Sequence, residues 1–400
     1  MDPLDNETIA LCRRAADFLA HRMFDEAISI MKQVVKTAPS PRTLSWLVAF
    51  LIAGGRTEEA IKQAIEATQS HQDSWETQDA LGRAMAVKGN YNGAVQAFQA
   101  SAALRCGSQP ATKPAHYVLH DLEQLEYLSR NIDLYPEFST IRSDERCNEI
   151  GPHMADIETE TPAVVREVDA SATPPLPLFI PKEAAIEQPL NTSLDFETIT
   201  TRFVEQGSTF VIIDDLLSVE ALNSLRHFCL GATVWRRSYE PGYVGAFPED
   251  GFASVLLFEI ADALRKAMPD VLVEYRLAQW WAFAYDQRLS GTDIHADDAD
   301  ISVNLWITRT EANLQRNHGG LIMWDRMAPD NWKFQDYNGD SEKVRSWLAE
   351  AGATETIIEH KANRAVLFSG HLFHRSDGAN FAPGYENRRR NITFLFHRTR

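Results

Sequence analysis

The chain has 400 residues, 44% of them hydrophobic, and a formal net charge of −17. This length suggests two or three domains with a sizeable core, and the acidic balance argues against nucleic acid as a partner, because phosphate binding needs clustered Lys and Arg. No apolar run approaches the length of a membrane span. The acidic N-terminus lacks the apolar core of a signal peptide, and the four cysteines are widely spaced. We therefore expect a cytoplasmic protein without membrane contact or a disulfide framework.

Residues 1–135 are predicted to form helix after helix. The segments FDEAISIM, RTEEAIKQA and YNGAVQAF place Ala27, Ala60 and Ala94 in similar contexts at spacings of 33 and 34 residues. This is the period of the tetratricopeptide (TPR) repeat, in which helix pairs bury their apolar faces by stacking on each other. The region resembles TPR domains, although its copies are degenerate, and a plain helical bundle is the alternative. In the third copy, Leu81 and Gly82 are expected to open the first helix.

Residues 136–193 differ in composition from what precedes them. Prolines recur and acidic residues dominate, which predicts an extended linker. The stretch ATPPLPLFIP, from Ala172 to Pro181, is too apolar for a free tether. Part of this segment is therefore expected to lie as an arm across a domain surface.

Residues 194–400 are predicted to contain two supporting helices and many short strands. The helices are expected over 218–228, with Ser218 as the N-cap, and over 252–268. Strands are expected over 208–213, 277–285, 301–307, 365–368 and 391–396, with a further strand that carries His371 and His374. This pattern indicates a double-stranded β-helix, a jelly roll of two packed sheets. With the helical region it makes a two-domain α + β chain. The polar segment 325–340 is either a lid over the site or a surface insertion.

The triplet His295-Ala296-Asp297 stands directly before the strand expected over 301–307. Side chains two residues apart on an extended segment point the same way. An imidazole and a carboxylate on one face are two thirds of the 2-His-1-carboxylate triad that holds non-haem Fe(II). The triplet alone is a weak signal, since His71-Gln72-Asp73 has the same spacing between helical segments, where we expect a polar surface.

The order of motifs in the C-terminal half resembles that of the 2-oxoglutarate/Fe(II) oxygenases, within them the prolyl-hydroxylase-like branch. The matching residues, in chain order, are Tyr285, His295, Asp297, His318-Gly319-Gly320, Leu367-Phe368 ahead of His374, and Arg389 with Ile392-Thr393. The resemblance covers roughly residues 194–400. It implies that His295, Asp297 and His374 are the metal ligands, with His371 as the rival for the third place. A carboxylate at Asp297 implies hydroxylation or another oxidation, because related halogenases have Gly or Ala there.

The basic run Arg388-Arg389-Arg390 leads into the last expected strand. Alternation places Arg389, Asn391 and Thr393 on one face, and an arginine can bind a carboxylate through two parallel hydrogen bonds. Arg389 is therefore predicted to bind the distal carboxylate of 2-oxoglutarate, with Thr393 as a hydroxyl partner, and the other two arginines are expected to be surface charges. Tyr285 and Asn304 either reach the co-substrate or simply pack.

The resemblance implies a dioxygenase that uses Fe(II), 2-oxoglutarate and O2, with ascorbate as a supporting reductant, and that releases succinate and CO2. Its substrate is expected to be an amino acid, a peptide, a protein or a carrier-bound group. The TPR-like region is expected to recruit that substrate or another protein, or to mediate self-association. Two alternatives remain: a hydroxylase of a free small metabolite with a purely structural helical region, and a TPR adaptor fused to a non-catalytic barrel.

Overall fold

The computed structural model describes residues 5–105, 112–139, 167–169, 176–207, 209–240, 242–286, 291–378 and 380–399. Most of the predicted linker therefore lies outside the described residues, as do Cys106 and Cys147. In the described part, Cys12 and Cys229 are free thiols. No helix there has both the length and the apolar character that a membrane crossing requires.

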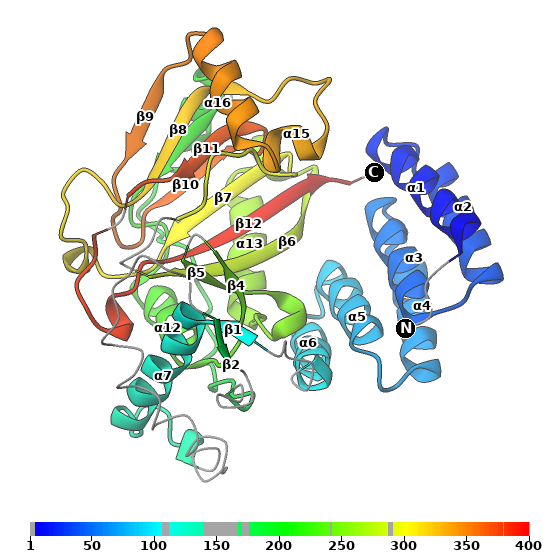
Figure 1. Ribbon diagram of the computed structural model, residues 1–400, viewed down its shortest axis with the longest axis horizontal. Helices are drawn as coiled ribbons and strands as arrows, with labels where there is room; N and C mark the ends of the chain where they lie inside the picture. The colour runs from blue at the N-terminus through cyan, green and yellow to red at the C-terminus, as the bar shows by residue number, and fades with distance from the viewer. Residues whose placement is uncertain are drawn as a thin grey trace.

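Within residues 5–105 the helices form three consecutive pairs (Figure 1). They are α1 (Asn6–Ala20) with α2 (Phe24–Thr37), α3 (Pro41–Ala53) with α4 (Thr57–Ser70), and α5 (Trp75–Lys88) with α6 (Tyr91–Arg105). The repeat expected from the alanine spacing is confirmed, since Ala27, Ala60 and Ala94 are all fully buried. The expected start of the third pair is wrong. Its first helix begins at Trp75, where Ser74 is the N-cap, so Leu81 and Gly82 lie inside the helix.

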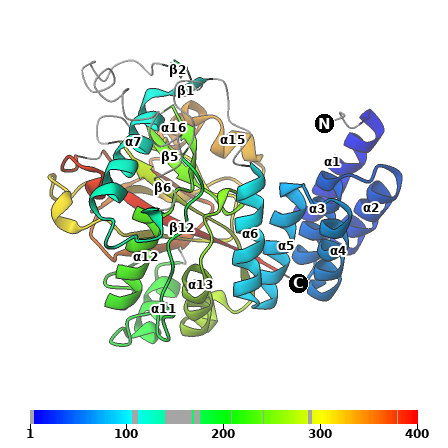
Figure 2. The same ribbon diagram turned by 90° about the horizontal axis from the view of Figure 1, so that it is seen from below.

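The third helix pair packs directly on the C-terminal half, and α6 lies between the repeats and the sheet region (Figure 2). Phe98 of α6 approaches Gly82 so closely that a Cβ atom there would lie 2.8 Å from the Phe98 ring. On its other side the ring of Phe98 meets Trp280, with centroids 5.4 Å apart. The helices α1–α4 instead share an apolar cluster of their own with α5. An ion pair between Arg22 and Asp300, 3.1 Å apart, joins them to the C-terminal half.

The described end of the predicted linker packs against the C-terminal half. It follows α7 (Ala115–Arg130) and a small sheet of β1 (Thr112–Pro114) and β2 (Glu167–Asp169). Leu176 and Phe179 are buried. The Thr233 hydroxyl accepts a hydrogen bond from the Phe179 N–H and donates one to the Pro177 carbonyl, each at 2.6 Å. These contacts hold the apolar stretch against the fold.

Two antiparallel sheets face each other in the C-terminal half, in the orders β3-β10-β7-β12-β6-β5-β4 and β11-β8-β9. The strands of the larger sheet are β3 (Phe210–Ile213), β4 (Trp235–Tyr239), β5 (Tyr243–Ala246), β6 (Tyr275–Tyr285), β7 (Ile301–Trp306), β10 (Ala365–Ser369) and β12 (Arg390–Arg398). Those of the smaller are β8 (Leu321–Met327), β9 (Glu355–Ile358) and β11 (Leu372–Ser376). Between them lies an apolar cluster to which both sheets contribute. The expected fold class, helical repeats followed by antiparallel sheets, is confirmed.

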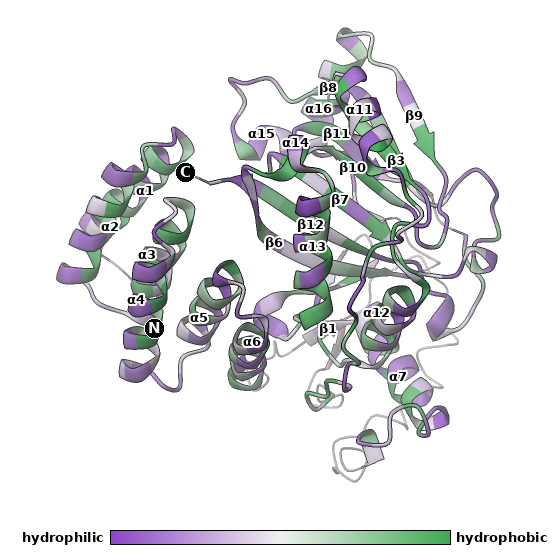
Figure 3. Ribbon diagram, turned by 180° about the vertical axis from the view of Figure 1, so that it is seen from behind, coloured by the Kyte–Doolittle hydropathy of each residue, from purple (hydrophilic) through white to green (hydrophobic). Residues whose placement is uncertain are grey.

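The two faces of the larger sheet have different chemistry, because strand side chains alternate between faces. The outer face packs against α11 (Phe196–Glu205), α12 (Val219–Gly231), α13 (Val255–Ala267) and α14 (Pro269–Leu272). Figure 3 views the sheet from this side, with α13 in front of its strands. As predicted, Ser218 caps α12 by accepting from the Ala221 N–H. The outer face of the sheet carries apolar residues on β7 and β12, which include Val303, Leu305, Ile392 and Phe394. The inner face carries Ser302, Asn304, Trp306, Asn391 and Thr393.

The polar segment 325–340 contains the helix α15 (Phe334–Asn338), and α16 (Ser341–Glu350) follows directly after it. It packs against the His-x-Asp segment through its backbone. The Ala296 N–H donates to the Tyr337 carbonyl at 3.0 Å, and the Asn338 side chain donates to the Ala296 carbonyl at 2.9 Å. The insertion thus supports the segment that carries the first two predicted ligands.

Candidate metal and co-substrate site

The three predicted metal ligands meet at one edge of the space between the two sheets. His295 and Asp297 precede β7, and His374 lies on β11. The backbones of His295 and His374 exchange two N–H to carbonyl hydrogen bonds of 2.9 Å each. One ligand atom from each of the three side chains lies within 4.8 Å of the others. The arrangement brings together residues that are nearly eighty positions apart in the chain.

Hydrogen bonds to the backbone aim both imidazoles at the same point. The Nδ1 atom of His295 donates to the Asp293 carbonyl at 2.7 Å, and the Nδ1 atom of His374 donates to the Leu372 carbonyl at 3.0 Å. The free Nε2 atoms then face the Asp297 carboxylate, at 3.7 Å from His295 and 3.9 Å from His374. Such contacts fix the tautomer and orientation that a metal-binding histidine needs.

Two further features fit a divalent metal. The Ser302 hydroxyl donates to Oδ2 of Asp297 at 2.7 Å, which fixes the carboxylate. Burial, with the nearby His295, lowers the pKa of His374 to about 4. His374 is therefore neutral near pH 7 and able to ligate without first losing a proton. Two imidazoles and one carboxylate on one side of a centre are the donor set that suits non-haem Fe(II) and leaves positions for other ligands.

The rival residues lie elsewhere. His371 is exposed in the turn before β11, and its ring centroid is 6.5 Å from that of Tyr337. Among the described residues, the group that could hold a metal consists of His295, Asp297 and His374, and does not include His371. His71 ends α4, with Asp73 in the following turn, as expected for polar surface.

Arg389 is a buried cation on the inner side of the fold. Its side chain is 1% exposed. It donates to the Gly320 carbonyl at 2.8 Å, and its guanidinium carbon lies 4.5 Å from the centre of the Tyr285 ring. In the described part of the chain its Nε and Nη1 atoms have no hydrogen-bond partner, and burial lowers its pKa. The charge of the buried Asp377 carboxylate acts on Arg389, but no described carboxylate forms a direct ion pair with it. A buried cation without a directly paired anion is costly, so the position suits an anionic ligand.

A short path of contacts joins this arginine to the metal cluster. The Ser376 hydroxyl donates to the Tyr285 hydroxyl at 3.2 Å. Ser376 and His374 stand two residues apart on β11, which corresponds to about 7 Å along a strand. Ser376 and Tyr285 thus connect the strand that carries His374 to Arg389.

Asn304 and Thr393 lie beside this path on the inner face. The Thr393 hydroxyl donates to Oδ1 of Asn304 at 3.4 Å, and Asn391 donates to the same oxygen at 2.7 Å. All three side chains are buried. The structure thus places every predicted site residue in one connected region between the sheets.

The prediction that Arg388 and Arg390 are surface charges is wrong. They are 7% and 2% exposed, on the side of β12 opposite to Arg389. Arg388 donates to Glu123 of α7 at 2.5 Å. Arg390 donates to the Tyr385 carbonyl at 2.8 Å, and its guanidinium carbon lies 4.3 Å from the Tyr385 ring centre. These two arginines tie α7 and the preceding loop to the sheet, where aromatic faces and carbonyls replace water around their charge.

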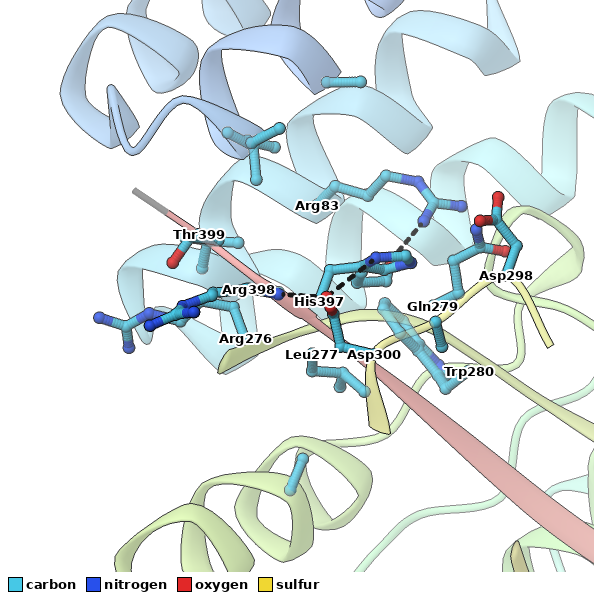
Figure 4. A pocket seen from close by; sticks show the side chains of 18 of the residues that line it. Arg83, Arg276, Leu277, Gln279, Trp280, Asp298, Asp300, His397, Arg398 and Thr399 are labelled. Atoms are coloured by element: carbon cyan, nitrogen blue, oxygen red, sulfur yellow. Dashed lines mark hydrogen bonds and ion pairs between the residues drawn. The ribbon is translucent and has the colours of Figure 1, made fainter. Parts of the chain in front are cut away.

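A cleft of about 1090 Å³ separates the helical repeats from the C-terminal half. It is lined by α1, α3 and α5 on one side, and by β6, the end of β12 and residues 298–300 on the other (Figure 4). Gln279 stands at its rim. Every second residue of β6 from this point on lies on the inner face: Gln279, Trp281, Phe283 and Tyr285. The ring centroids of Trp281 and Phe283 are 6.1 Å apart, and those of Phe283 and Tyr285 are 6.4 Å apart. This row of side chains connects the cleft to Arg389.

None of the known protein-family models matches the chain, and no curated protein matches it. Solved structures of the two kinds that the sequence resembles are similar to parts of it. The TPR domain of Sgt2 from Aspergillus fumigatus is 27% identical with a TM-score of 0.23, over 24% of this chain and 64% of that one. HygX from Streptomyces hygroscopicus, solved with nickel, 2-oxoglutarate and hygromycin B, is 14% identical with a TM-score of 0.36, over 50% of this chain and 87% of that one. A prolyl-4-hydroxylase from Pseudomonas putida is 17% identical with a TM-score of 0.34, over 52% of this chain and all of that one.

All three TM-scores are low, so the activity must be inferred from the side chains of the site itself. Two residues near the site were not identified from the sequence. Ser302 shares the inner face with Asn304, which strand alternation could have indicated, and its hydroxyl contacts Asp297. His360, two residues after β9, has no sequence signal that places it near Arg389.

Proposed function

We propose that the protein is an Fe(II)- and 2-oxoglutarate-dependent oxygenase that hydroxylates a C–H bond of its substrate. The observation that supports this most is the pairing of two features. A cluster of two histidines and one carboxylate is linked through Ser376 and Tyr285 to Arg389, a buried cation without a direct ion pair among the described residues. A metal site alone would not need that arginine, and an adaptor without catalysis would need neither.

The protein's own residues have defined roles in this proposal. His295, Asp297 and His374 hold the metal, and Ser302 fixes the carboxylate. Arg389 binds the remote carboxylate of the co-substrate, with Tyr285 stacked beneath its guanidinium. When bound, iron and 2-oxoglutarate supply the activation of O2, with release of succinate and CO2. The surrounding fold orients the two ligands and keeps bulk water away.

The cleft supports a substrate carried on a peptide, a protein or a carrier. Its volume is at the upper limit of small-molecule pockets, which typically measure about 300–1,000 Å³, and it is open along its length between two parts of the fold. A free metabolite would need only the region beside the metal. Ala53 of α3 lines the cleft, and it is far in sequence from the proposed metal ligands. An Ala53→Trp variant should therefore slow turnover of a polymer-borne substrate and leave substrate-free succinate formation unchanged.

The experiment that tests the proposed activity is succinate formation from 2-oxoglutarate by the full chain with Fe(II) loaded anaerobically, followed by exposure to O2. The wild type should form succinate. His295→Ala should lose metal and turnover, and Arg389→Ala should keep the metal but bind 2-oxoglutarate at least about tenfold more weakly, as expected for a lost charge-assisted hydrogen bond.

Two variants serve as controls. His71→Ala removes the histidine of the other His-x-Asp triplet, and Arg316→Ala removes an exposed arginine. Both should behave like the wild type. A wild type that binds neither Fe(II) nor 2-oxoglutarate would contradict the proposal and favour the adaptor alternative.

A further inference from the structure

The inner end of the co-substrate region has more hydrogen-bond donors than acceptors. In the described part of the chain, the unpartnered buried atoms there include Nε and Nη1 of Arg389, Nε1 of Trp306, Nδ2 of Asn304 and both ring nitrogens of His360. Trp306 is fully buried, and His360 is 1% exposed. A buried N–H group without an acceptor costs about 1–3 kcal/mol, so several in one place indicate a missing partner.

The side chains that carry these atoms are close to one another in the fold. Asn304 and Trp306 stand two residues apart on β7, and therefore point to the same face. Asn391, two residues after Arg389, is the cross-strand partner of Trp306. The ring centroids of Trp306 and His360 are 6.0 Å apart.

The backbone also brings His360 next to Arg389. The His360 N–H donates to the carbonyl of His318, two residues before Gly320, whose own carbonyl holds Arg389. Burial and the nearby charge of Arg389 lower the pKa of His360 to about 3. His360 is therefore neutral at physiological pH and supplies one N–H donor and one acceptor.

The chemistry of this group selects a carboxylate. A carboxylate accepts hydrogen bonds at about four lone-pair positions and carries a negative charge. Arg389 has two N–H groups without a partner and feels the charge of Asp377 without a direct ion pair in the described protein. A neutral ligand would satisfy the N–H groups of Trp306 and His360 but would not pair directly with this buried cation. The T-shaped contact between His360 and Phe381, with centroids 4.9 Å apart, closes the space behind the ring.

We propose that Trp306 and His360 complete, with Arg389, the subsite for the remote carboxylate of the co-substrate. This inference rests on the proposed oxygenase function and deepens it. Arg389 supplies the charge, while the indole N–H of Trp306 and one ring N–H of His360 direct further hydrogen bonds to the carboxylate oxygens. Trp306 and His360 are thus co-substrate-binding residues outside the motifs that the sequence displays.

The test is binding of 2-oxoglutarate to the full chain loaded with redox-inert Mn(II), measured by titration calorimetry without turnover. Trp306→Phe and His360→Phe each keep a ring and remove the N–H. Each should weaken 2-oxoglutarate binding about tenfold or more, as expected for the loss of a hydrogen bond to a charged group. The unfolding midpoint of the ligand-free Trp306→Phe variant should not fall, because the N–H it removes has no acceptor in the described protein.

Trp235→Phe is the matched control. Trp235 is also buried, but its indole N–H donates to the Cys229 carbonyl at 3.2 Å on the other side of the sheet. This variant should unfold at a lower midpoint and bind 2-oxoglutarate like the wild type.

The outcomes separate this inference from the proposed function. If the wild type binds and both variants bind equally well, Trp306 and His360 only pack, and this inference alone is overturned. If the wild type itself fails to bind, the proposed function falls, and this inference with it.

Discussion

The two faces of the larger sheet make opposite use of the same strands. On the outer face, Phe394 and Leu305 are fully buried against helices, and the contacts are apolar. On the inner face, Thr393 and Asn304 are almost as well buried, yet they hydrogen-bond to each other and stand near donors without partners. The outer face therefore stabilises the fold, whereas the inner face contains unpaired buried donors at an energetic cost, which a bound ligand would offset under the function proposed above. Adjacent residues of β12 therefore lie in different environments: Phe394 packs in the apolar core, and Thr393 lies in the polar inner region.

The largest effect on stability is expected from Phe394→Ala. Removing a fully buried phenylalanine from a packed core costs about 3–5 kcal/mol of unfolding free energy. Thr393→Val, at the preceding position on the inner face, should cost less, about 1–2 kcal/mol, because it removes two long hydrogen bonds, to Asn304 and from Asn391, and keeps the shape. Urea unfolding of the ligand-free protein measures both. If both variants lost the same unfolding free energy, the two faces would not differ in their contribution to stability.

An intermediate effect is expected from His120→Phe, which concerns a polar residue on the outer side. The ring of His120 is fully buried between Trp235 and Tyr385. Burial, together with the charges of Arg388 and Arg390, lowers its pKa from 6.5 to about 4. The unfolded chain takes up a proton below pH 6.5 and the folded chain does not, so stability falls as the pH drops from about 6.5 toward 4.

The expected contribution of His120 is about 1.4 kcal/mol per pH unit in that window, or about 2 kcal/mol between pH 6.5 and 5. His120→Phe should remove this part of the acid sensitivity while the phenyl ring keeps the aromatic contacts. Unfolding free energies at pH 7 and pH 5, with chelator present, measure it. An unchanged pH dependence would mean that His120 is protonated in the folded state.

The smallest effect is expected from Arg22→Ala. Its ion pair with Asp300 is partly exposed, with 49% and 27% of the two side chains accessible. Exposed ion pairs typically contribute less than about 1 kcal/mol and weaken with salt. The unfolding midpoint should therefore change little at low salt and not at all at high salt. A large loss would show that the repeats and the C-terminal half are coupled more strongly at this point than the contact suggests.

The motif-bearing parts of the molecule were predictable from the sequence because they depend on local geometry. The repeat spacing predicted the helix pairs, and strand alternation separated Arg389 from its two neighbours. The positions of Arg388 and Arg390 were not predictable in this way. A basic run is ordinarily solvated. Here the tertiary contacts with Glu123 and Tyr385 offset the desolvation cost of burying the two arginines.

The remainder of the candidate site depends on long-range packing. His360 reaches the inner space from the end of β9, and nothing in its flanking residues indicates this. The indole N–H of Trp306 is informative only because no described acceptor lies within reach. An absent partner leaves no trace in a sequence pattern.

The packing of Phe98 determines which parts of the protein are expected to unfold together. Because Phe98 and Ala94 belong to the same apolar cluster as the outer face of the sheet, the last helix pair and the sheet should lose their protection from hydrogen exchange together. The helices α1–α4, which have a separate cluster, should exchange earlier and on their own. The boundary between the units that unfold cooperatively then falls inside the repeats rather than at the proline-rich segment. A fragment beginning at residue 194 would accordingly expose Trp280 to water.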